Sequence, residues 1–172
     1  MRFIKPFLIG LTGLTIVITL MSLLLPSQIK ISRAVVINSS AYKIYPQVAD
    51  LRNWKNWQPL FADSGSAITY SDSLNKNPFC DINSEGRQLH IQMLSNMPSA
   101  IQFLLQSKNE KDIFNEISIT PINTNQTQVE WKTLVKLSWF PWDKFRGIFI
   151  DRIIGPGYEE SLNNLKKITE TN

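Results

Sequence analysis

The chain has 172 residues, of which 43% are hydrophobic and 19% are charged, and this composition is typical of a globular protein. Its net charge of +4 comes from Lys and Arg residues scattered among Asp and Glu, so we expect no nucleic-acid partner. Cys80 and His90 are the single cysteine and the single histidine, which argues against an internal disulfide and a zinc site. We therefore expect neither a metal nor a cofactor.

The N-terminal segment has the properties of a membrane helix. Residues 7–25 carry no charge and match the ~20 residues that cross a bilayer as a helix, with Arg2 and Lys5 before them. A secretory signal is the alternative, but the apolar run exceeds the ~7–15 residues of a signal core, and no small-residue cleavage pattern follows it. The sequence therefore favours an uncleaved anchor and linker over residues 1–28, followed by one domain over residues 29–172.

The orientation of this anchor is decided by its leading segment. Basic residues on its two sides are almost balanced, with Lys30, Arg33 and Lys43 following the span. A very short positive segment before a first span is typical of a signal-anchor. We therefore expect a single-pass membrane protein whose soluble domain is extracytoplasmic.

The first elements of the domain are a strand and two short helices. β-Branched residues dominate positions 29–38, which predicts a strand that ends at Asn38. Residues 41–50 have helical spacing, although Pro46 keeps that helix short. In residues 51–57, Trp54 and Trp57 lie three positions apart, so both indoles share one face of a second short helix.

The middle of the chain alternates between apolar and polar residues and predicts an antiparallel sheet with one covered face. Weaker strands are expected at residues 67–71 and 79–84, and clear ones at residues 87–94, 101–108, 113–120 and 129–137. The apolar positions of the clear strands are Leu89, Ile91, Met93, Ile101, Phe103, Leu105, Ile113, Ile117, Ile119, Val129, Trp131, Thr133, Val135 and Leu137.

The C-terminal segment is predicted to be the helix that covers this face. From Gly157 onward, Tyr158, Leu162 and Leu165 fall on one helical stripe. Residues 143–154 are also compatible with a helix, and the intervening Gly155–Pro156–Gly157 predicts a kink or a loop.

This order of elements resembles the helix-grip fold of the START and polyketide cyclase/dehydrase (SRPBCC) superfamily. Three stretches carry the resemblance: residues 32–38; residues 48–57, which include Asp50–Leu51–Arg52–Asn53–Trp54; and residues 154–167, which include Gly155–Pro156–Gly157–Tyr158. The resemblance implies an α+β domain in which a curved antiparallel sheet wraps around a long C-terminal helix. It also implies a cavity between sheet and helix that commonly holds lipids or other apolar molecules.

Three functions are weighed. The leading one is a membrane-anchored protein that binds a lipid or other hydrophobic small molecule. The second is a non-catalytic interaction module with an unknown protein partner. The third is an enzyme of the cyclase or aromatase kind. No catalytic constellation is visible, so we expect no enzyme. The candidate cavity residues are Trp54, Trp57, Leu89, Ile91, Met93, Ile101, Phe103, Ile117, Ile119, Trp131, Thr133, Val135, Leu162 and Leu165, and the same residues would also make an ordinary core.

Some residues have a structural and a functional interpretation. Trp54 and Trp57 can close a pocket as a lid, but core packing is the simpler interpretation. The aromatic segment Trp139–Phe140–Pro141–Trp142 can touch a membrane interface, line the cavity mouth or pack against the sheet edge. His90 is expected on the polar face of its strand, and Cys80 is expected to be a packed, unreactive thiol.

Overall fold

The computed structural model describes residues 4–61, 67–72, 77–84, 87–108 and 110–171. Two long helices, two 3-10 helices, one short α-helix and seven strands make up this part of the chain. In order they are α1 (Ile4–Leu23), β1 (Gln28–Ile37), α2 (Ala41–Ala49), η1 (Leu51–Asn56), η2 (Pro59–Phe61), β2 (Ala67–Tyr70), β3 (Phe79–Ser84), β4 (Arg87–Met97), β5 (Ala100–Ser107), β6 (Ile113–Asn123), β7 (Gln126–Lys136) and α3 (Pro141–Thr171).

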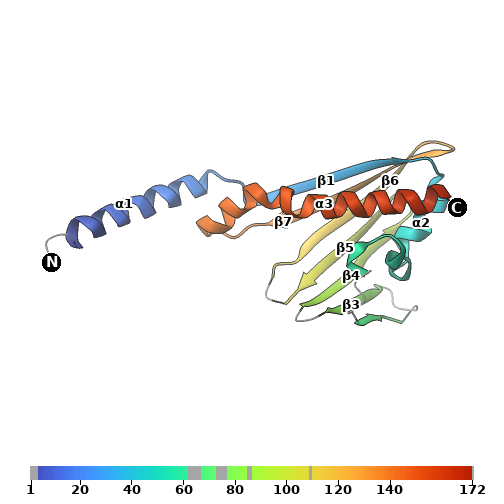
Figure 1. The fold of residues 1–172 in the computed structure, drawn as a ribbon, viewed down its shortest axis with the longest axis horizontal. Coiled ribbons are helices and arrows are strands. Elements are labelled where there is room, and N and C mark those ends of the chain that lie inside the picture. The colour runs from blue at the N-terminus through green and yellow to red at the C-terminus, as the bar shows by residue number, and fades with distance from the viewer. Residues whose placement is uncertain (1–3, 62–66, 73–76, 85–86, 109, 172) are drawn as a thin grey trace.

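All seven strands form one antiparallel sheet in the order β1-β7-β6-β5-β4-β3-β2. After β1 the chain crosses through α2, η1 and η2 to the opposite edge of the sheet, and then returns strand by strand to β7. There β7 pairs with β1 along its whole length, from Gln28 opposite Lys136 to Ile37 opposite Thr127. The sheet curves beside α3, which lies along it (Figure 1). The predicted α+β fold, with a curved sheet and a long C-terminal helix, is confirmed.

The covered face of the sheet forms the core. Alternate residues of β4 to β7 are buried, as the alternation predicts, and they pack against Leu162 and Leu165 of α3 and against η1. Ring contacts join this layer: the Trp54 ring centroid lies 4.9 Å from that of Phe103, and the Trp57 centroid lies 6.0 Å from that of Trp131. Large apolar side chains therefore pack between the helices and the sheet, and their burial is the main stabilising contribution in a domain.

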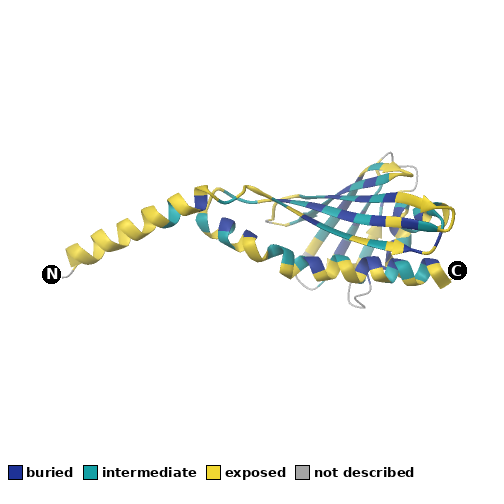
Figure 2. Cartoon of the chain, turned by 90° about the horizontal axis from the view of Figure 1, so that it is seen from above, coloured by how far each residue is buried: buried dark blue, intermediate teal, exposed yellow. Residues whose placement is uncertain are grey.

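Helix α3 continues through Gly155–Pro156–Gly157, where the sequence predicts a kink or a loop. Proline removes one helical hydrogen bond and crowds the preceding turn, so a change of direction without a break is its usual effect. Figure 2 shows that α3 bends part-way along its length. Packing explains why the helix persists, because α3 is buried against the sheet on both sides of this segment, at Gly147 and at Leu162.

The two glycines at positions 147 and 155 allow α3 to approach β1 closely. A Cβ atom at Gly147 would overlap side-chain atoms of Leu137 and Ile29, and one at Gly155 would overlap the Arg33 guanidinium. That guanidinium pairs with Asp151, with 3.1 Å between Nη2 and Oδ1. Small residues therefore set the distance between α3 and the edge of the sheet.

Helix α1 projects away from the sheet at the end of the molecule opposite the C terminus (Figures 1 and 2). It has 20 residues, a mean hydropathy of 2.0 in its most apolar window, and almost no surface buried against the rest of the chain. By length and composition it is able to cross a membrane, and a signal sequence has the same properties.

Candidate ligand-binding pocket

An apolar pocket of about 510 Å³ lies between one end of the sheet, the 3-10 segment and the middle of α3. Small-molecule sites usually have volumes of about 300–1,000 Å³, so this pocket has the size of such a site. Its lining is mostly aliphatic, and consists of Gln58, Pro59, Leu60, Ile82, Ser84, Leu89, Leu105, Ile113, Ile153, Ile154, Gly157 and Tyr158.

The rim of the pocket is formed by exposed apolar residues. Leu60 on η2 and Ile153 on α3 are both lining residues and both exposed, so they mark where the pocket meets solvent. Gly157 also lies there, and a Cβ added to it would meet no atom within 4 Å. The opening is therefore bordered by α3 on one side and by the 3-10 segment on the other.

Two of the polar residues that line the pocket, Gln58 and Tyr158, are each held by a neighbouring side chain. Gln58 is buried, and its Oε1 accepts a hydrogen bond of 2.9 Å from the Ser161 hydroxyl. Burial raises the pKa of the Tyr158 phenol, while its hydrogen bond with Thr133 opposes that shift. Tyr158 is therefore a neutral phenol at ordinary pH.

The hydrogen-bond network behind Tyr158 has a defined direction. The Trp131 indole can only donate, and it lies 3.0 Å from Asn115 Oδ1, which fixes the orientation of that amide. The same oxygen also accepts a hydrogen bond of 2.7 Å from the Thr133 hydroxyl. Asn115 thus holds Trp131 and Thr133 in place behind Tyr158.

Asn115 is a polar residue on the covered, apolar face of β6. The structure gives it a structural role: it is buried and binds Trp131 and Thr133, and its Nδ2 donates to the Ile113 carbonyl at 3.0 Å. Buried polar groups need such partners. The network thus satisfies the indole and the hydroxyl that the core would otherwise leave unpaired.

The structure places one of the predicted cavity residues on the pocket lining and the others in the core. Leu89 lines the pocket. The remaining predicted residues are all buried and lie outside the lining: Trp54, Trp57, Ile91, Met93, Ile101, Phe103, Ile117, Ile119, Trp131, Thr133, Val135, Leu162 and Leu165. Thr133 nonetheless lies directly behind the pocket through its hydrogen bond with Tyr158.

Trp54 and Trp57 are fixed by their indole nitrogens as well as by packing. The Trp54 indole donates to the Val48 carbonyl at 2.8 Å, and the Trp57 indole donates to the Gln47 carbonyl at 2.9 Å. Both acceptors belong to the last turn of α2, whose carbonyls lack helical partners. The two residues therefore join α2 to the core, which is the structural interpretation given above.

The remaining candidates lie away from the pocket. His90 is on the outer face of the sheet, where its Nδ1 lies 2.6 Å from Asp81 Oδ1 and its ring contacts Phe79. Cys80 is 0% exposed, and burial, followed by the nearby charge of Asp81, raises the pKa of its thiol to about 12. Within the described residues, no group of three or more His, Cys, Asp or Glu side chains is arranged to hold a metal ion.

No protein-family model and no curated protein sequence matches the chain. Solved structures do match. The Zhui aromatase/cyclase from Streptomyces sp. R1128 superposes with a TM-score of 0.64 at 10% identity, covering 83% of this chain and 94% of its own. A START superfamily protein from Mycobacterium smegmatis superposes with a TM-score of 0.62 at 16% identity, and the match covers 83% of this chain and 97% of that protein. Truncated norcoclaurine synthase from Thalictrum flavum superposes with a TM-score of 0.60 at 11% identity, and the match covers 82% of this chain and 92% of the synthase.

These matches correct one expectation. The absence of a catalytic motif led us to expect no enzyme, and that inference is contradicted, because an aromatase/cyclase and a norcoclaurine synthase have the same fold. One fold hosts many unrelated functions, so the lack of a recognisable motif does not decide whether a chain with this fold is an enzyme. At 10% and 11% identity the likeness establishes a common fold and no particular reaction.

The matched proteins are covered over most of their length, and the strand order and long C-terminal helix agree with the resemblance in the sequence. The described chain therefore has the helix-grip fold that it shares with these solved structures.

Proposed function

We propose that this chain is a membrane-anchored protein that holds an apolar small molecule between its sheet and α3. The observation that carries the proposal is the pocket of about 510 Å³. The sequence alone left an interaction module with a closed core as an alternative, and an open apolar pocket favours the binding role. The START-like and cyclase-like folds of the matched structures support the same choice.

The lining restricts the chemistry of the ligand. Aliphatic side chains from β3, β4, β5 and β6 suit an apolar body, and polar groups are confined to a few positions that include Gln58 and Tyr158. Tyr158 is a neutral phenol, so its hydroxyl is able to donate to or accept from a polar group of the ligand. A largely apolar molecule with a single polar group fits this pattern.

The anchor is the second part of the proposal. Helix α1 exposes its apolar side chains all around, so a bilayer is the environment that would satisfy them. We place the anchor and linker in residues 1–28 and the binding domain in residues 29–172. With Lys5 on the inner side, the domain is extracytoplasmic.

The test is to identify what the full-length protein carries. Protein purified from its own host in mild detergent is analysed by native mass spectrometry, and released small molecules are identified. Lipids that adhere to α1 are subtracted by a variant, Gly157→Phe, which adds a ring at an open position of the pocket rim. Gly157→Ala adds only a methyl group at the same position and is the matched control.

A compound that accompanies the native protein and Gly157→Ala, and is missing from Gly157→Phe, establishes binding in this pocket and names the ligand class. The same compounds at the same occupancy in all three proteins would refute the pocket as the binding site.

A further inference from the structure

The first turns of α3 and the segment before them expose large apolar side chains. Trp139 is 78% exposed, Trp142 is 64% exposed, and Phe140, Phe149 and Ile153 are also largely exposed. Residues 142, 149 and 153 are spaced by seven and four positions, which places them on one face of the helix. We call these five residues the α3 apolar stripe.

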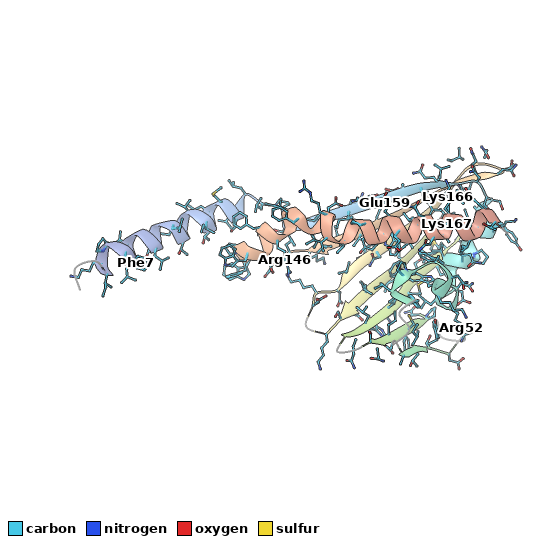
Figure 3. All side chains as sticks on the ribbon, viewed as in Figure 1. Phe7, Arg52, Arg146, Glu159, Lys166 and Lys167 are labelled. Carbon is cyan, nitrogen blue, oxygen red and sulfur yellow. The ribbon has the colours of Figure 1, made fainter. Side chains whose placement is uncertain are left out.

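The stripe begins at the level where α1 ends. Lys144, which is buried, donates from Nζ to the Leu25 carbonyl at 3.1 Å and to the Ser27 hydroxyl at 2.6 Å. The first turn of α3 is thereby fixed to the chain that leaves α1. Figure 3 shows Arg146 on the part of α3 near α1, and Glu159 and Lys166 farther along, over the sheet.

A bilayer around α1 has its interface at the same level. Residues 7–25 fill a hydrocarbon core of about 30 Å, so Leu25 marks the depth at which the headgroups begin. Tryptophan and other aromatic side chains concentrate at that depth in membrane proteins, because the ring is apolar and the indole N–H remains hydrated. Trp139, Phe140 and Trp142 are thus placed where an interface would accommodate them.

We infer that the α3 apolar stripe is a membrane-contact surface that turns the pocket rim toward the bilayer, and this inference rests on the proposed anchor. Ile153 connects the two features, because it belongs to the stripe and also lines the pocket. It lies eleven helical positions after Trp142, or about 16 Å along the helix axis. The stripe thus joins the interface to the rim by an apolar surface along which a lipid-like ligand passes without crossing open water.

Tryptophan fluorescence tests the inference in the full chain. Trp54, Trp57 and Trp131 are buried, so added quenchers reach mainly Trp139 and Trp142. The protein is reconstituted into vesicles of phosphatidylcholine and phosphatidylglycerol, with and without bromine on the upper acyl carbons. We expect the brominated vesicles to quench part of the emission, aqueous iodide to have little effect, and the lipid quenching to disappear in the double variant Trp139→Phe/Trp142→Phe.

Flotation of the same vesicles separates the possible failures. Protein that floats, but whose Trp139 and Trp142 emission is quenched by iodide and not by brominated lipid, has its anchor inserted and its stripe in water, and that result overturns this inference alone. Protein that does not float refutes the anchor and the inference with it. Equal lipid quenching in the double Phe variant would also overturn the inference, since the signal would then come from the buried tryptophans.

Discussion

Asn115 is a single polar residue on which two buried groups depend, the Trp131 indole and the Thr133 hydroxyl. Replacing it with Ala leaves the Trp131 indole N–H and the Thr133 hydroxyl without their shared acceptor. An unsatisfied buried group costs about 1–3 kcal/mol, so we expect Asn115→Ala to lower the free energy of unfolding by at least about 2 kcal/mol. Urea denaturation followed by tryptophan fluorescence measures this.

The control is Asn125→Ala in the exposed β6–β7 turn, where a change below about 0.5 kcal/mol is expected. Equal losses in the two variants would show that the buried network does not stabilise the domain.

Cys80 gives a prediction about reactivity. Only the thiolate reacts with thiol reagents, and burial raises the pKa of this thiol to about 12 from an ordinary 9.0. We expect no modification of the folded protein by a maleimide at neutral pH, and full modification in denaturant. Rapid modification of the folded protein would mean that β3 opens locally.

The same shift predicts a dependence of stability on pH. Because the folded state raises the pKa, the contribution of the thiol is complete below pH 9.0 and is lost as the pH rises through about 12. The unfolding free energy should therefore fall more steeply above pH 9.0 in the native chain than in Cys80→Ala, which keeps every tyrosine. If the unfolding free energies of the two proteins, measured by denaturant titration, fall in parallel as the pH rises, the raised pKa of Cys80 is contradicted.

At the scale of the element, two of the glycines of α3 differ in the space around them. At position 147 an added Cβ atom meets Leu137 and Ile29, whereas at position 157 it meets no atom within 4 Å. Overpacking costs about 1–3 kcal/mol, and replacing an exposed helical glycine gains up to about 1 kcal/mol. We therefore expect Gly147→Leu to lower the melting temperature and Gly157→Leu to maintain or raise it, as measured by circular dichroism.

A loss of stability in both variants would mean that leucine in α3 is harmful wherever it is placed. A loss in neither would mean that Leu137 and Ile29 move aside without strain, and that Gly147 does not set the distance between α3 and the sheet.

The sequence predicts the elements well where a local period decides them. Strands β4 to β7 are recognisable because a half-buried strand must alternate, and the residues expected to face inward do so. The prediction at Gly155–Pro156–Gly157 is incomplete for the opposite reason: local preference favours an interruption, but packing on both sides of the segment keeps α3 helical.

The position of the pocket is less predictable. Alternation shows which face of a strand is covered, but not how far along the sheet the helix lies against it. Leu105 and Ile113 continue the predicted apolar face of β5 and β6, and they line the pocket because they lie beyond the ring cluster around Trp54. Tertiary geometry alone separates these lining residues from core residues such as Phe103 and Ile117.

For the whole molecule, the orientation of the domain is open to a direct test. Tyr42 on α2 is 87% exposed at the end of the molecule far from α1, so a cysteine there is accessible to reagents (Figure 1). We expect Tyr42→Cys to be labelled in intact cells by a maleimide that does not cross membranes. The native chain, whose Cys80 is buried, is the matched control. Labelling that requires lysis of the cells would place the domain in the cytoplasm.

The pairing of β1 with β7 has a consequence during synthesis. Gln28 must find Lys136, more than 100 residues later in the chain, and every other strand is made in between. At roughly 5–20 residues per second, β1 waits about 5–20 s for its partner. A strand with unsatisfied backbone groups is prone to pair wrongly during that interval. Because β1 directly follows α1, an inserted anchor would hold this waiting strand at the membrane surface and away from other nascent chains.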